Sequence, residues 1–119
     1  MLAAKGFTRM LNDTLAKIEA RLRSAESVPV ERRHELLELV NTLRNEIDEL
    51  SKTDSEQAQS IAGFTQVSTH EATRSDANPD LVKASLDELT GSVAGFEKSH
   101  PRLVQIVNNI STTLSNLGI

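Results

Sequence analysis

The sequence has no cysteine, no tryptophan and no tyrosine, and it has little glycine or proline. Without cysteine the chain can form neither disulfides nor thiolate metal sites, which suits a cytoplasmic protein. Phenylalanine is the only aromatic residue, so the core must be aliphatic. Five glycines and three prolines in 119 residues predict few loops. No stretch approaches the roughly 18 consecutive apolar residues of a transmembrane segment, and no signal peptide is expected.

Charge is unevenly distributed along the chain. Residues 1–25 hold five basic and two acidic residues, net +3, whereas residues 26–52 hold four basic and seven acidic residues, net −3. The whole chain has a net charge of −4. No nucleic-acid partner is expected, because phosphate contacts need a basic surface. The basic first segment could neutralise the acidic second segment in a helical hairpin, or it could bind an anionic surface.

Four stretches have apolar residues at alternating gaps of three and four, the spacing of helices that pack along another helix. They predict a single all-α domain over residues 1–119, built as an antiparallel bundle of four heptad-patterned helices or coiled-coil-like hairpins. Residues 1–7 are expected to be flexible, with a short helical extension as the alternative. The expected helices cover residues 8–25, 28–74, 79–97 and 101–117. The predicted core residues are Leu15, Ile18, Leu22, Leu36, Val40, Leu43, Ile47, Leu50, Leu86, Leu89, Val93, Phe96, Leu103, Val107, Ile110, Leu114 and Leu117.

The second helix is the hardest to delimit. No proline interrupts it, and its heptad register runs from Leu50 to Phe64 through two polar positions. We therefore expect one long helix over residues 28–74, about 70 Å at 1.5 Å per residue. The alternative is a break near residues 53–55, where Thr53 begins the pattern of a capping box.

The last helix has no charged side chain after Arg102. A freely exposed helical face usually carries Lys and Glu, so a polar but uncharged face suits contact with another helix. In addition, the shorter helices would leave apolar flanks of the long helix exposed, and such flanks mark interfaces. We therefore expect a homodimer with the last helix in or beside the interface. The residues expected at this interface are Ile61, Phe64, Val104, Ile106 and Thr113.

Motifs for chemistry are missing from the sequence. The pair His70-Glu71 lacks the second histidine of the HExxH zinc motif, and no phosphate-binding loop or nucleophile elbow is found. We expect no enzyme, no cofactor and no bound metal. The expected function is a self-associating helical interaction module, an adaptor or small chaperone with an unknown protein partner. The alternative is a regulator that docks on a larger assembly or an anionic membrane surface through the basic first segment.

Three stretches resemble a family of small bacterial all-helical proteins that is catalogued only as a domain of unknown function: VERRHELLELVNTLRNEIDELS, SIAGFTQVSTHEATR and FEKSHPRLVQIVNNISTTLSNLGI. The resemblance covers about Leu11 to Ile119. It implies a bacterial, cytoplasmic helical protein, and it transfers no catalytic or binding residue to this chain.

Overall fold

The computed structural model describes residues 2–117, and the side chains of residues 9–117. This part of the chain forms five α-helices and no strand, so the predicted all-α class is confirmed and the predicted number of four helices is wrong. None of the described helices is long and apolar enough to cross a membrane. The helices are α1 (Leu2–Ser24), α2 (Val30–Ser51), α3 (Ser55–Ala72), α4 (Pro79–Ser92) and α5 (Pro101–Leu117).

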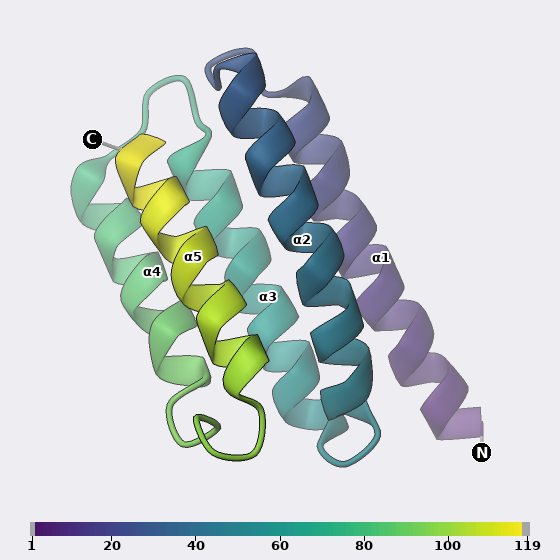
Figure 1. Cartoon of the computed structure of the whole chain (residues 1–119). Coiled ribbons are helices and arrows are strands. Elements are labelled where there is room, and N and C mark those ends of the chain that lie inside the picture. Colours follow the sequence, from purple (N-terminus) through teal and green to yellow (C-terminus); the bar gives the residue numbers. More distant parts are fainter. Residues whose placement is uncertain (1, 118–119) are drawn as a thin grey trace.

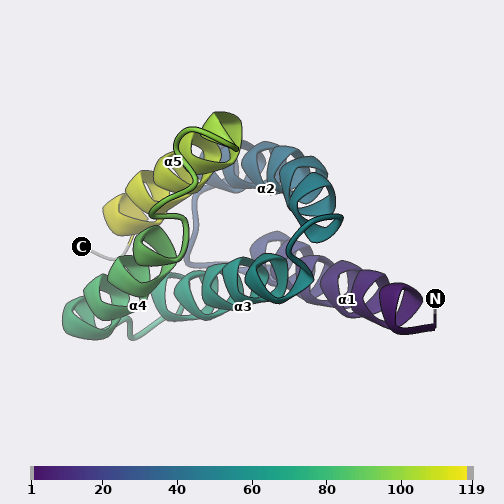
Figure 2. The same cartoon turned by 90° about the horizontal axis from the view of Figure 1, so that it is seen from below.

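The helices form two layers (Figure 1, Figure 2). α1, α3 and α4 lie side by side in one layer, and α2 and α5 lie over them in the other. Successive helices run in opposite directions, as short connections require. α3 is the central element, because it packs against each of the other four helices. The bundle measures 42 × 27 × 22 Å, so the chain is short and broad where one long helix was expected.

The predicted helix over residues 28–74 is interrupted, because the chain turns after Ser51. The Asp54 amide donates to the Leu50 carbonyl at 2.8 Å, and this bond closes the turn. The Asp54 side chain then accepts a hydrogen bond from the Gln57 amide at 3.1 Å and caps the N-terminus of α3. The break lies where the alternative placed it, with Asp54 as the cap instead of Thr53. A continuous helix would have carried Asp54 and Gln57 into the apolar stripe, which the turn avoids.

Two further helix ends differ from the sequence prediction. α1 begins at Leu2 and not near residue 8, so the described part of this segment forms the helical extension that was the alternative, while residue 1 lies outside the described part. α4 ends at Ser92 and not at residue 97. Gly95 follows with φ +96°, a left-handed conformation that favours glycine, and it leads the chain into a loop. Phe96 therefore lies in this loop, where its ring centroid is 5.9 Å from that of His100.

The core is aliphatic and runs through all five helices. Of the predicted core residues, all are buried except Phe96 and Leu117, which are half-buried and pack against the others. α3 adds buried polar residues whose hydroxyls bind the backbone. Thr65 donates to the Ile61 carbonyl at 2.7 Å, an i−4 contact within the helix. Because such hydroxyls find a local acceptor, they can be buried at the centre of the bundle.

The residues predicted at a dimer interface lie differently in the structure. Ile61 and Thr113 are buried inside the single chain, with exposed fractions of 0% and 7%. Phe64, Val104 and Ile106 are half-buried and pack against the core. The prediction for Ile61 and Thr113 is wrong because α3 is surrounded by helices of its own chain and α5 packs against α2, α3 and α4. With no overlong helix left to cover, a dimer has to rest on other features.

Candidate functional site

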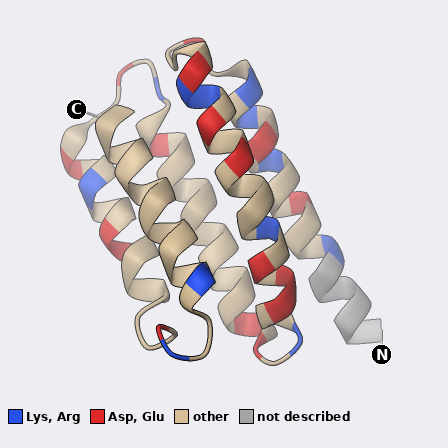
Figure 3. Cartoon of the chain, viewed as in Figure 1, with Lys and Arg blue, Asp and Glu red and all other residues tan. Residues whose placement is uncertain are grey.

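The outer face of α5 is uncharged. Five exposed residues form this face, which we call the uncharged stripe: Gln105, Asn108, Asn109, Thr112 and Asn116. Their spacing of one, three and four places them along one side of the helix. Figure 3 shows no charge on α5 beyond its first turn, whereas the neighbouring α2 bears both signs along its length.

Packing of the opposite side holds α5 in a helix. Asn, Ser and Thr are poorer helix formers than Lys, Glu or Ala, and α5 contains many of them. The helix is stabilised by its buried apolar residues, among them Leu103, Val107 and Leu114, which are fully enclosed by the bundle. The stripe is therefore a feature that helix stability alone does not explain.

A groove of about 540 Å³ lies between α4 and α5. Val82 and Leu86 form its apolar wall on α4, and the small Ser111 and Ser115 face it from α5. The groove adjoins the uncharged stripe, because Thr112 and Asn116 belong to both. The other lining residues are Pro79, Asp80, Lys83, Asp87 and Thr90.

Ser111 has an unused hydroxyl beside this groove. Its Oγ is buried and has no hydrogen-bond partner among the residues that the structure describes. The neighbouring hydroxyls do have acceptors, since Thr112 donates to the Asn108 carbonyl and Thr90 to the Leu86 carbonyl, both at 3.0 Å. A buried polar group without a partner costs about 1–3 kcal/mol. Ser111 thus stands out among the hydroxyls of the groove.

The charged residues of the groove are largely balanced. Lys83 Nζ and Asp87 Oδ2 lie 3.0 Å apart, an i,i+4 ion pair on the exposed side of α4. Asp80 occupies the first turn of α4, where a carboxylate complements the positive end of the helix dipole. The groove therefore offers hydroxyls and an apolar wall, and its one lysine is already paired.

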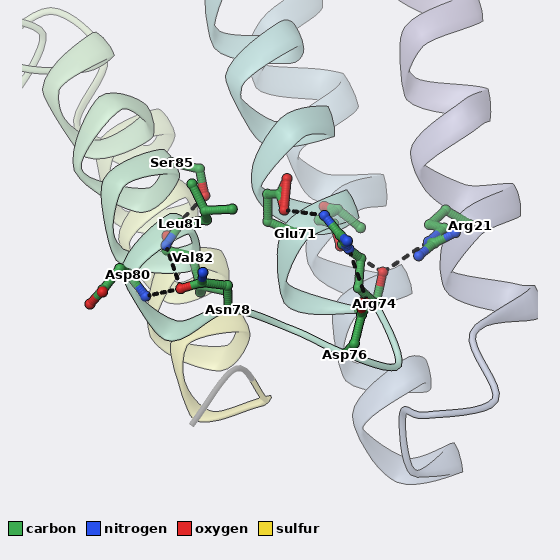
Figure 4. Close-up of polar contacts among 11 residues, drawn as sticks. Arg21, Glu71, Arg74, Asp76, Asn78, Asp80, Leu81, Val82 and Ser85 are labelled. Atoms are coloured by element: carbon green, nitrogen blue, oxygen red, sulfur yellow. Dashed lines mark hydrogen bonds and ion pairs between the residues drawn. The ribbon is translucent and has the colours of Figure 1, made fainter.

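The junction between α3 and α4 (Figure 4) leads directly into Pro79 and Asp80, which line the groove at the start of α4. Asn78 is the N-cap of α4, and its side chain accepts a hydrogen bond from the Asp80 amide at 2.9 Å. In the loop before it, Arg74 binds both Glu71 and Asp76 at 3.3 Å. The hydrogen bond to Asp76 raises the pKa of Arg74 above its ordinary value, followed by the effect of Glu71. Arg74 therefore joins the two carboxylates of this junction as a permanent cation.

The basic first segment is partly engaged within the chain. Arg21 Nε donates to Thr73 Oγ1 at 3.0 Å and ties α1 to the end of α3. Glu19 forms an ion pair with Arg44, so this contact between the first two segments joins an acid of the basic segment to a base of the acidic one. Lys17 is exposed on α1. Individual contacts such as these join the two segments, in place of the predicted general attraction between a basic helix and an acidic helix.

Groups for metal binding do not assemble in the described part of the chain. No three His, Asp or Glu side chains there lie close enough to hold a metal ion. His70 is exposed on α3, and its neighbour Glu71 is bound to Arg74. The site that the structure does assemble is the groove with its adjoining stripe.

The sequence showed one of these two features. The uncharged stripe follows from the absence of charge after Arg102. The groove could not be predicted from the sequence, because it depends on how α4 and α5 pack around Ser111 and Ser115. The spacing of these two small residues, one turn apart on one helix, is the only signal in the sequence for it.

Comparison with known families gives one finding. A family model described as a domain of unknown function (DUF4404) matches residues 36–119. The match begins inside α2 and includes all of α3, α4 and α5, so it contains both the groove and the stripe. No curated protein and no solved structure matches the chain. The family match confirms the predicted resemblance to a domain of unknown function, over residues 36–119 where the resemblance was expected from about Leu11.

Proposed function

We propose that this chain, which belongs to the DUF4404 family of domains of unknown function, is a non-enzymatic helical module that self-associates as a homodimer. The uncharged stripe of α5 is the observation that supports this proposal. Two copies with a net charge of −4 repel each other, and they approach at the lowest electrostatic cost through a face without charge. Asn, Gln and Thr side chains both donate and accept hydrogen bonds, so the stripe is complementary to itself across a two-fold axis.

The closed core supports association between folded chains. Apolar residues from all five helices form one buried core inside a single chain, so a second copy is not needed to complete the fold. We therefore propose a reversible dimer, in which the two copies present the rest of their surfaces to a protein partner. This is the arrangement of an adaptor or a small chaperone.

Insertion of one carboxylate into the stripe tests the proposal. Light scattering at tens of micromolar should give the wild-type chain twice its mass of 13.0 kDa. Asn109→Glu should give the mass of one chain, because two stripes would each bring a desolvated charge to the axis. Asn45→Glu is the matched control, since Asn45 is also an exposed helical asparagine and lies on α2. A wild-type mass of 13.0 kDa, or equal dissociation by both substitutions, would refute self-association through the stripe.

A second candidate function is docking on a larger assembly or an anionic membrane surface through α1. Its support is that Arg9 and Lys17 are exposed on this helix. Binding through these residues weakens at high salt because the charges are screened. Sedimentation with vesicles of phosphatidylserine, compared between wild type and Lys17→Glu, tests it: equal binding of the two proteins would exclude a role for this face.

A further inference from the structure

The α4–α5 groove has the size of a small-molecule site. Its volume of about 540 Å³ falls within the range of about 300–1,000 Å³ that ligand pockets occupy. The groove has an apolar wall at Val82 and Leu86, and its opposite wall is made of hydroxyl-bearing side chains, including Ser111 and Ser115. An amphiphilic ligand would match both walls, with its apolar part on α4 and its polar end toward α5.

We propose that this groove binds a neutral amphiphile, a short apolar chain that ends in a hydroxyl or carbonyl oxygen. The buried Ser111 hydroxyl is the group that selects for the oxygen, because it is a donor without an acceptor among the described residues. Ser111 Oγ is closed off from the groove as it stands, so a ligand oxygen would accept this hydrogen bond after the serine changes its side-chain rotamer and turns the hydroxyl toward the groove. The apolar chain would then lie along Val82 and Leu86.

The charges around the groove favour a neutral ligand. Lys83 is bound to Asp87, so the one cation in the lining does not offer a free partner to a carboxylate or phosphate. Asp80 and Asp87 would repel an anion at the mouth. Asp80 already complements the dipole of α4, which leaves little to attract a cation.

The depth of Ser111 favours a thin ligand over a second protein chain. Ser111 Oγ is almost completely covered, and the serine as a whole is 8% exposed. A helix is about 10–12 Å wide with its side chains, so its backbone cannot approach a hydroxyl recessed between α4 and α5. A single alkyl chain with a terminal oxygen can enter where a helix cannot.

Titration of the full chain with 1-hexanol, followed by amide chemical shifts, tests this proposal. We expect saturable shifts that centre on Leu86, Ser111 and Ser115. Ser111→Ala should weaken 1-hexanol binding about 5- to 10-fold, which is the loss of one net hydrogen bond. Hexanoate, which has the same chain length and a negative charge, should bind more weakly than 1-hexanol. Equal affinity of Ser111→Ala for 1-hexanol would overturn the role of the hydroxyl and with it the proposal.

Two leucine substitutions separate the groove from general apolar partitioning. Ser115→Leu should fill the groove and abolish the saturable shifts, whereas Ser60→Leu, at an exposed serine of α3, should leave them unchanged. Shifts that instead centre on the exposed Val67 and Leu81 would overturn the proposal. Ligand binding by a chain that stays monomeric would refute self-association and support the groove.

Discussion

At the scale of single residues, Ser111 lowers the free energy of unfolding. Its hydroxyl is buried without a partner among the described residues, and serine is a poorer helix former than alanine. Ser111→Ala should therefore raise the free energy of unfolding by about 1–2 kcal/mol, as measured by urea denaturation. Ser115→Ala, one turn further on, should gain only about 0.5 kcal/mol, because its half-exposed hydroxyl reaches water. Equal gains at the two positions, or a loss at Ser111, would show that the Ser111 hydroxyl is satisfied.

Core leucines should respond in the opposite direction. Leu43 of α2 and Leu114 of α5 are both fully buried, Leu43 near the middle of its helix and Leu114 in the last turn of its helix. Truncation of either to alanine should cost about 2–5 kcal/mol, because the bundle closes only partly around the cavity. Lys17→Ala on the exposed side of α1 should stay within about 0.5 kcal/mol. Similar urea midpoints for all three variants would contradict the assignment of the core.

At the scale of elements, the break between α2 and α3 depends on one cap. The Asp54 side chain accepts a hydrogen bond from the Gln57 amide in the first turn of α3, and no other side-chain cap is seen at this helix start. Asp54→Ala should lower the free energy of unfolding by about 0.5–2 kcal/mol. Asp48→Ala is the control, because it also removes an aspartate side chain, from the exposed face of α2. It should change the free energy of unfolding by less than about 0.5 kcal/mol. Hydrogen exchange should also show faster opening of the first turn of α3 in Asp54→Ala only.

The elements also show what sequence can and cannot predict here. The buried apolar faces of α1, α2 and α5 are predictable from the sequence. Apolar residues recur there at helical spacing, and a helix buries such a face in the core. The heptad register favours one long helix over a break at Asp54. The reason is that the register counts positions and takes no account of the cost of burying Asp54 and Gln57. Thr113 was assigned to an interface for being polar, yet its own chain buries it. The free hydroxyl of Ser111 depends on the approach of α4 to α5, which no local pattern encodes.

At the scale of the whole molecule, a charged face and an uncharged face lie next to each other within one layer. α2 and α5 lie side by side in one layer, but their outer faces differ, because charges of both signs run along α2 and none follows Arg102 on α5 (Figure 3). The central position of α3 lets the core close without a second copy. Because the core is already closed, the charges on the outer faces would determine which face forms a dimer interface.

Salt dependence distinguishes the two surfaces that could make such contacts. Two copies with a net charge of −4 repel at low salt, and added salt shortens the reach of this repulsion from roughly 10 Å at 0.1 M to about 3 Å at 1 M. If the uncharged stripe forms the interface, the dissociation constant measured by sedimentation equilibrium should stay constant or fall between 0.05 and about 0.5 M NaCl. Contacts through Arg9 and Lys17 of α1 would weaken over the same range, because their attraction to a negative partner is screened. A dissociation constant that rises steeply with salt would therefore place the interface on α1 and exclude the stripe of α5.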